Sequence, residues 1–380
     1  MKGKYFWLLI ILIILMFLSS LKVYAKNRLE LSYQSINRDL PYYQMTIAPV
    51  DPHNISRMGT AIFDHSQSTG QTIRYSHFTQ FRNRPVEIQL SLGKEQAEGS
   101  WNLRELGGYW YGESDNLDSI STRATFTYFL SPSLGLKAGF ARENLNHEGF
   151  AADNRPSWLR GDWTRKEEKN RLILGIEKDL LKNLKLGCTY TPIWQTQDFE
   201  FSLDITTDGR WWKAWGDGSF EGDGWNFKVT YLPKDFLELR LLSGFEDGNG
   251  NLECTEVISG GQEHRDVFRT STNSLKKSEY DLAADLFLTK RLCLNLSYFV
   301  NNYNQTYEYL DNDRLDYQLQ KNGWRCGFEW LISSGLKFKT IYSHANFKRE
   351  DNWYYFSEEA PSWEGKGEED KINLGWIFEF

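Results

Sequence analysis

The sequence predicts a closed antiparallel β-barrel that crosses a membrane, with about 14 strands and about 16 as the alternative. Apolar and polar residues alternate with a period of two over segments of about ten residues, the length that a tilted strand needs to cross a bilayer. Short turns alternate with long polar connections along the chain. The alternation also continues to the last residue, Phe380. An apolar terminal strand leaves no unpaired backbone edge only if it closes against the first strand.

The N-terminus has the pattern of a secretory signal peptide over residues 1–25. A charged start, MKGK, precedes an apolar stretch, and Val23 and Ala25 are the small residues expected at a cleavage site. An uncleaved anchor helix is the alternative. Residues 26–70 are ambiguous and are predicted to form an N-terminal arm, a plug or extra strands, because the run from Arg28 alternates well. The transmembrane barrel is predicted over residues 71–380.

Period-two patterns give the strands of the barrel. In TRATFTYFL, Ala124, Phe126 and Tyr128 share one face, and Arg123 and Thr125 lie on the other. The first two strands are predicted at residues 71–78 and from Val86, and the segment at Trp101 fits least well. The clear strands are residues 122–130, 134–142, 171–177, 184–194, 225–231, 236–242, 280–288, 291–300, 324–331, 336–342 and 372–380.

The predicted connections fall into two alternating classes. Short turns are expected at Ser131, Asp179, Pro233, Thr289 and Ser333. Long polar loops are expected near residues 145–168, 197–222, 247–276, 307–316 and 349–370. Short turns on one rim and long loops on the other are typical of a transmembrane barrel, with the turns periplasmic and the loops extracellular.

The last six residues, GWIFEF, resemble the C-terminal signal of Gram-negative outer-membrane β-barrels, the porin-like class. Gly375, Phe378 and Phe380 stand at the matching positions, whereas Leu374 occupies a place that is usually polar. The resemblance implies a location in the bacterial outer membrane, with outer-membrane lipid and the barrel-assembly machinery as partners. A secreted β-sandwich, which also alternates, is the alternative fold.

Charge and cysteine content exclude several classes of function. Without the three lysines of the first 25 residues, 41 basic residues face 51 acidic residues, a formal charge of −10. Nucleic acid is therefore not an expected partner, because phosphate binding needs a basic surface. The four cysteines are widely spaced, and no cluster with metal-ligand spacing occurs. The sequence predicts no metal and no cofactor.

The polar face of the strands predicts a wet lumen, because a charged side chain facing lipid near the membrane midplane costs about 2–4 kcal/mol. The charges have mixed sign, so they either form opposed acidic and basic sides of a channel or pair with one another. The predicted lumen residues are Arg74, Glu87, Arg123, Lys137, Arg171, Glu177, Lys228, Glu238, Arg240, Glu279, Asp281, Asp285, Arg325, Glu329, Lys337 and Lys339.

Tryptophans beside carboxylates are concentrated in the polar segments and suggest ligand binding at the rim. Flat aromatic faces with nearby acceptors suit sugar rings, so saccharide or oligosaccharide is the predicted cargo of a porin or substrate-selective channel. Packing of the loops over the mouth is the alternative role. These residues are Trp158, Trp163, Trp211, Trp212, Trp215, Trp353 and Trp363.

Two other functions remain open at the level of sequence. A surface receptor or adhesin would use the same tryptophan-rich loops without transport. An outer-membrane hydrolase would need a catalytic group, and the segments DHS around His65 and EHRD around His264 are the only local groupings of acid, base and nucleophile. Neither lies in a catalytic motif, and the sequence predicts that the protein is not an enzyme.

Overall fold

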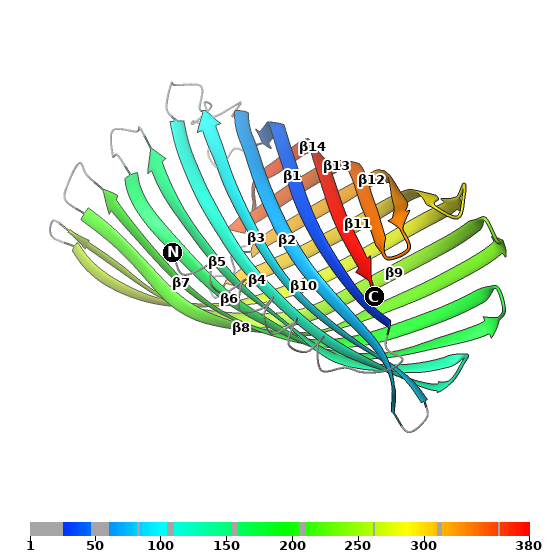
Figure 1. The fold of residues 1–380 in the computed structure, drawn as a ribbon. Helices are drawn as coiled ribbons and strands as arrows, with labels where there is room; N and C mark the ends of the chain where they lie inside the picture. The colour runs from blue at the N-terminus through cyan, green and yellow to red at the C-terminus, as the bar shows by residue number, and fades with distance from the viewer. Residues whose placement is uncertain are drawn as a thin grey trace, which may run out of the picture.

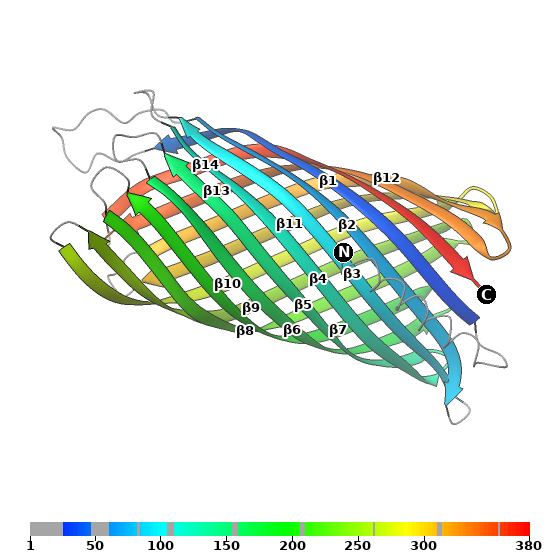
Figure 2. The same ribbon diagram turned by 60° about the vertical axis from the view of Figure 1, so that its left-hand side comes forward.

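The chain folds into one closed antiparallel barrel in a computed structural model (Figures 1 and 2). The structure describes residues 26–46, 61–81, 84–104, 110–153, 159–205, 210–260, 263–309, 314–355 and 358–380. Its strands are β1 (Lys26–Thr46), β2 (Ala61–Phe81), β3 (Arg84–Arg104), β4 (Trp110–Ser131), β5 (Leu134–Asp153), β6 (Leu159–Leu181), β7 (Leu184–Ile205), β8 (Arg210–Lys234), β9 (Leu237–Gly260), β10 (Glu263–Phe287), β11 (Leu292–Tyr309), β12 (Arg314–Ser333), β13 (Leu336–Tyr355) and β14 (Glu358–Glu379).

Each strand pairs with its neighbours in sequence, and β1 pairs with β14 to close the barrel. In Figure 1 the blue β1 lies beside the red β14. At the seam, Asn27 N donates to Phe380 O at 2.8 Å, and Phe380 N donates to Asn27 O at 3.0 Å. Closure satisfies the backbone groups of both terminal strands, and a sheet surrounded by lipid requires this. The fold predicted from the sequence is confirmed.

The strand count agrees with the sequence, but one predicted strand was misplaced. The first strand is Lys26–Thr46, so an extra strand, one of the three alternatives for residues 26–70, describes this part of the chain, and the barrel wall includes it. Trp101 is not in a strand of its own but near the end of β3, which pairs with β4. The extra strand and the misplaced one offset each other in the count. The predicted signal peptide lies outside the described residues.

The five short turns of the sequence prediction are confirmed, and they connect β4 to β5, β6 to β7, β8 to β9, β10 to β11 and β12 to β13. The rim that carries them is called the turn rim below. Most residues of the predicted long loops instead belong to strands, since the strands are 18–25 residues long. These polar segments extend the barrel wall beyond the ten or so residues that cross a bilayer.

The outer face carries an apolar belt on the half of the barrel next to the turn rim. Its large side chains are exposed and include Leu90, Phe126, Leu136, Leu174, Phe227, Leu241, Leu282, Leu296, Trp330 and Trp376. Farther along the same outward rows the residues become polar, at Arg142, Asn170, Asp223, Asp247, Lys276, Asn302, Asn322 and Asp370. Lipid can solvate the exposed apolar band, and water can solvate the polar half. No helix of the described residues is long and apolar enough to cross a membrane.

Candidate functional site: the inner wall of the barrel

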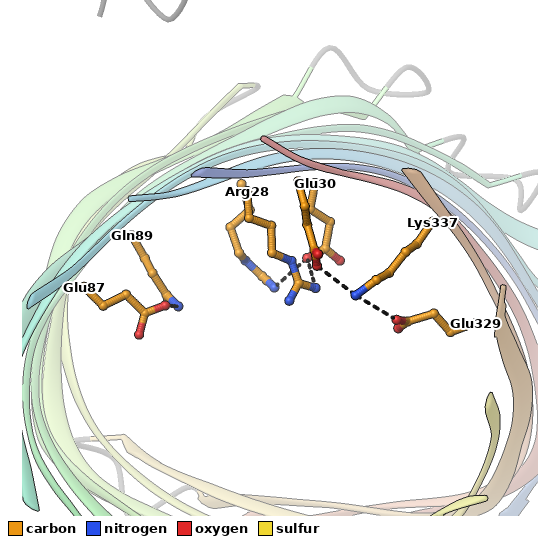
Figure 3. A network of polar contacts seen from close by, with 8 residues as sticks. Arg28, Glu30, Glu87, Gln89, Glu329 and Lys337 are labelled. Atoms are coloured by element: carbon orange, nitrogen blue, oxygen red, sulfur yellow. Dashed lines mark hydrogen bonds and ion pairs between the residues drawn. The ribbon is translucent and has the colours of Figure 1, made fainter. Parts of the chain in front are cut away.

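The inner face is identified by side chains that point into the barrel. Figure 3 shows Glu30, Glu87, Glu329 and Lys337 directed inward from four different strands. Paired residues of neighbouring antiparallel strands lie on the same face of a sheet. The pairing therefore extends the inner face around the whole barrel.

All sixteen residues predicted to line the lumen fall on this inner face. The ladder pairs Arg74 with Glu30, Glu87 with Thr127, and Glu329 with Lys339, and the remaining members follow along the same rows. A single register satisfies the whole set because a slip of one residue would turn every charge of a strand toward lipid. Their role in solute passage is treated below as a proposal.

Charged side chains form ion pairs on each side of the closing seam of the barrel (Figure 3). Arg74 lies 3.4 Å from Glu30, and Arg28 lies 3.6 Å from the same carboxylate. On the other side of the seam, Lys337 contacts Glu379 at 2.8 Å and Glu329 at 3.8 Å. The strands that flank the seam are therefore joined to their neighbours by ion pairs as well as by backbone hydrogen bonds.

The acidic cluster on β10 is neutralised by partners. Asp285 contacts Arg240 at 2.6 Å, and Glu279 contacts Lys277 at 2.7 Å. Asp281 pairs with Arg325, which reaches it over β11 and stacks above the Phe299 ring at 4.2 Å. Of the two alternatives from sequence, mutual pairing describes this part of the wall.

Apolar side chains form a patch on the inner wall just beyond the level of the outer belt. Ile193, Phe220 and Leu275 are buried together, and Tyr303 packs against them. The Phe220 ring lies over Gly248 of β9, which has no side-chain carbon to block it. A Cβ added to Gly248 would lie 2.4 Å from the Phe220 ring. Burial raises the pKa of Tyr303, so its phenol remains neutral.

The sequence did not single out this patch. Its members come from four strands and are isolated apolar residues on otherwise polar faces. The sequence feature that could have revealed the patch is an apolar residue at an inward-facing strand position. Ile193 is an example, because it pairs with the inward-facing Arg171.

Two cavities lie against this wall. The first, of about 580 Å³, is lined by Arg123, Arg171 and Ile193 among others. The second, of about 430 Å³, shares Arg171 and is lined by Phe220, Leu275 and Tyr303. Both sizes fall within the range of small-molecule sites.

The predicted tryptophan cluster is not assembled as expected. Trp163 points inward and packs edge-on against His147 at 4.5 Å. Trp211 and Trp215 lie in outward rows of β8, and all three belong to strands, not loops. Trp158 lies outside the described residues, as do the side chains of Trp212, Trp353 and Trp363.

The structure describes the residues of the predicted assembly signal but not the side chains of the two candidate catalytic histidines. Gly375 faces inward, while Phe378 and Phe380 face outward at the turn rim. The side chains of His65 and His264 lie outside the described part of the chain. Within the described residues, no three His, Cys, Asp or Glu residues are grouped so that they could hold a metal.

No protein-family model and no curated protein matches this chain. Solved structures match it over most of its length. They include the TodX monoaromatic hydrocarbon channel carrying the deltaS2 mutation, with a TM-score of 0.57 and 12% identity over 94% of this chain and 91% of that one. The Pseudomonas putida toluene transporter TodX matches with a TM-score of 0.53 and 11% identity over 92% and 89%.

A Pseudomonas aeruginosa FadL homologue matches with a TM-score of 0.50 and 10% identity over 94% and 90% of the two chains. What this chain shares with these proteins is the fold. Identities of 10–12% show likeness of fold alone.

Proposed function

We propose that the protein is a channel of the Gram-negative outer membrane through which small solutes cross by diffusion. The observation that carries this proposal is the division of one closed sheet into an apolar outer belt and an inner wall lined with ion pairs. Lipid accepts the outer face and water solvates the inner one. The turn rim would face the periplasm, and the polar half of the barrel would extend outside the cell.

The described strands send no segment across the lumen, and two cavities lie against the inner wall. The similar structures bear the names of a toluene transporter and a monoaromatic hydrocarbon channel, and these names support transport of small molecules. Saccharide cargo depended on converging tryptophans. Because the described members of that set face in different directions, saccharide is not part of the proposal.

Conductance across a planar lipid bilayer tests the channel. Refolded protein should produce discrete conductance steps in KCl, and heat-denatured protein should not. Thr189 lines the larger cavity, so Thr189→Trp should lower the conductance of each step because it narrows the lumen. Val229→Trp, on the outward face of β8, is the matched control and should leave the step size unchanged.

A silent bilayer from protein that migrates as a folded, heat-modifiable barrel would contradict the proposal. Equal steps from the wild type and Thr189→Trp would place the conducting path elsewhere. A silent bilayer would favour the receptor alternative drawn from the sequence, whereas equal steps would retain a channel and reject the role of Thr189.

A further inference from the structure

Cations on the inner wall differ in whether they have a partner. On β9 to β13, Arg240, Arg325 and Lys337 each contact a carboxylate. On β4, β5 and β8, Arg123, Lys137 and Lys228 make no hydrogen bond or ion pair with any residue that the structure describes. Arg123, Lys137 and Lys228 are therefore cations without an ion pair among the described residues, as Lys339 on β13 also is.

Arg123 lies in the middle of a basic row. Along the ladder, Arg74 pairs with Ser91, which pairs with Arg123, which pairs with Ala141, which pairs with Arg171. The row thus holds an arginine on every second strand, with small residues between them. Arg74 contacts Glu30 at 3.4 Å and Arg171 contacts Glu143 at 3.8 Å, but Arg123 contacts no acid among the described residues.

The same row leads into the apolar patch. Arg171 pairs with Ile193, and Ile193 pairs with Gly222. The cavity of about 580 Å³ is lined by Arg123 and Ile193 together, so a guanidinium and an apolar surface border one space. The neighbouring cavity continues from Arg171 to Phe220, Leu275 and Tyr303.

Asn273, beside the apolar patch, adds an unsatisfied polar atom. Its side-chain oxygen is buried and has no hydrogen-bond partner, and the residue lines the same cavity as Phe220. A buried acceptor without a donor is costly, and a ligand or water that donates a hydrogen bond would relieve the cost.

We propose that this wall is a binding site for a small organic anion, with its carboxylate on Arg123 and its apolar part against Ile193, the edge of the apolar patch that lines the same cavity. The planar guanidinium fits a carboxylate with two parallel hydrogen bonds. A bare inorganic anion would leave the apolar patch unused, and a neutral hydrocarbon would leave the arginine unpaired. The site deepens the channel function proposed above and rests on it for its biological role.

Calorimetric titration of benzoate into the detergent-solubilised barrel tests the site without depending on conductance. Benzoate should bind the wild type more tightly than acetate, and neutral benzyl alcohol should bind weakly. Arg123→Gln should weaken benzoate binding by about tenfold, as expected for loss of a hydrogen bond to a charged group. Arg123→Lys keeps the positive charge but loses the planar guanidinium that donates two parallel hydrogen bonds. Its benzoate affinity should lie between those of the wild type and Arg123→Gln.

Arg325→Gln removes the same charge from the far side of the lumen and is the matched control, expected to leave benzoate affinity unchanged. Ile193→Ala should weaken benzoate binding and leave acetate binding unchanged, because Ile193 lines the same cavity as Arg123. Equal benzoate affinity in the wild type and in a folded Arg123→Gln variant would overturn the site. Equal losses in Arg123→Gln and Arg325→Gln would also overturn it, because they would indicate a diffuse charge effect.

The outcomes for the site and for the channel can be told apart. Benzoate binding by a barrel that conducts no current would retain the site and reject the channel. Conductance that benzoate leaves unchanged, together with no heat of binding, would retain the channel and reject the site.

Discussion

Among the described residues beyond the apolar belt, the most buried charged side chain is Glu369 on β14, whose exposed fraction is 5%. It accepts a hydrogen bond from Arg38 at 2.9 Å on β1 and another from Lys321 on β12. Burial alone would raise the pKa of this carboxyl, but the two cations outweigh burial and hold it below its ordinary value. One carboxylate thus ties three strands together.

Glu369→Gln should lower the free energy of unfolding by roughly 1–3 kcal/mol near pH 7, because two half-buried cations lose their anion. A carboxyl with a depressed pKa contributes stability above its ordinary value of 4.5 and loses it as pH falls through the folded pKa. The difference between wild type and variant should therefore shrink from pH 7 toward pH 3. Thermal unfolding in detergent, followed by circular dichroism, measures it.

Glu364→Gln is the matched control on the same strand. Glu364 is half exposed and lies 3.1 Å from Lys348. An exposed pair contributes less than about 1 kcal/mol, so this variant should remain close to the wild type at every pH. A Glu369→Gln difference that does not change with pH would show that the carboxylate is not the source of the stability.

At the scale of an element, β14 holds the barrel closed. Its last residues hydrogen-bond on both sides, to β1 through Asn27 and to the turn before β13 through Gly335. The Phe380 ring faces outward and is half exposed at the edge of the apolar belt. The end of the chain therefore contributes both backbone pairing and membrane contact.

Deletion of Phe380 should reduce the yield of assembled barrel, since it removes two backbone hydrogen bonds of the seam and one belt aromatic. The measurement is the fraction of protein in the heat-modifiable form after expression in the outer membrane. Phe380→Tyr keeps the backbone and the ring and should assemble normally. An unchanged yield from the truncated chain would show that closure does not need this residue.

At the scale of the whole molecule, the barrel is longer than a membrane is thick. The strands of 18–25 residues exceed the 9–11 residues or so that cross a bilayer. Large exposed apolar residues are concentrated on the half near the turn rim, with isolated ones such as Trp215 and Phe268 beyond it. Lipid contact is thus restricted to part of the wall, and the remaining wall is held by backbone pairing with water on its outer side.

The apolar belt predicts that charged substitutions at two adjacent residues of β10 change the stability of the barrel by different amounts. Leu282, exposed by 60%, faces outward in the belt, and Ala283 faces the lumen beside Asp281 and Asp285. Leu282→Arg should destabilise the barrel by about 2–4 kcal/mol in lipid, whereas Ala283→Lys should change stability little. Urea unfolding in lipid vesicles measures both. A larger effect at Ala283 would reverse the assignment of the two faces.

Alternation along single strands was enough to predict the barrel class, the short turns and the inward charges. This works because lipid on one side and water on the other impose a period of two that is visible within ten residues. The prediction failed where that contrast is absent. Beyond the belt both faces meet water, so residues such as those of 145–153 lose the pattern, and the strand is maintained by backbone pairing and by cross-strand contacts such as His147 with Asp115.

The sequence by itself determined which face of each strand meets lipid, because each residue carries its own transfer cost. Only the tertiary structure decided which charges have partners and which do not. Arg325 reaches Asp281 over an intervening strand, while Arg123 lies between small neighbours and makes no ion pair among the described residues. Such distances depend on the register and curvature of several strands together, which no single segment of the chain encodes.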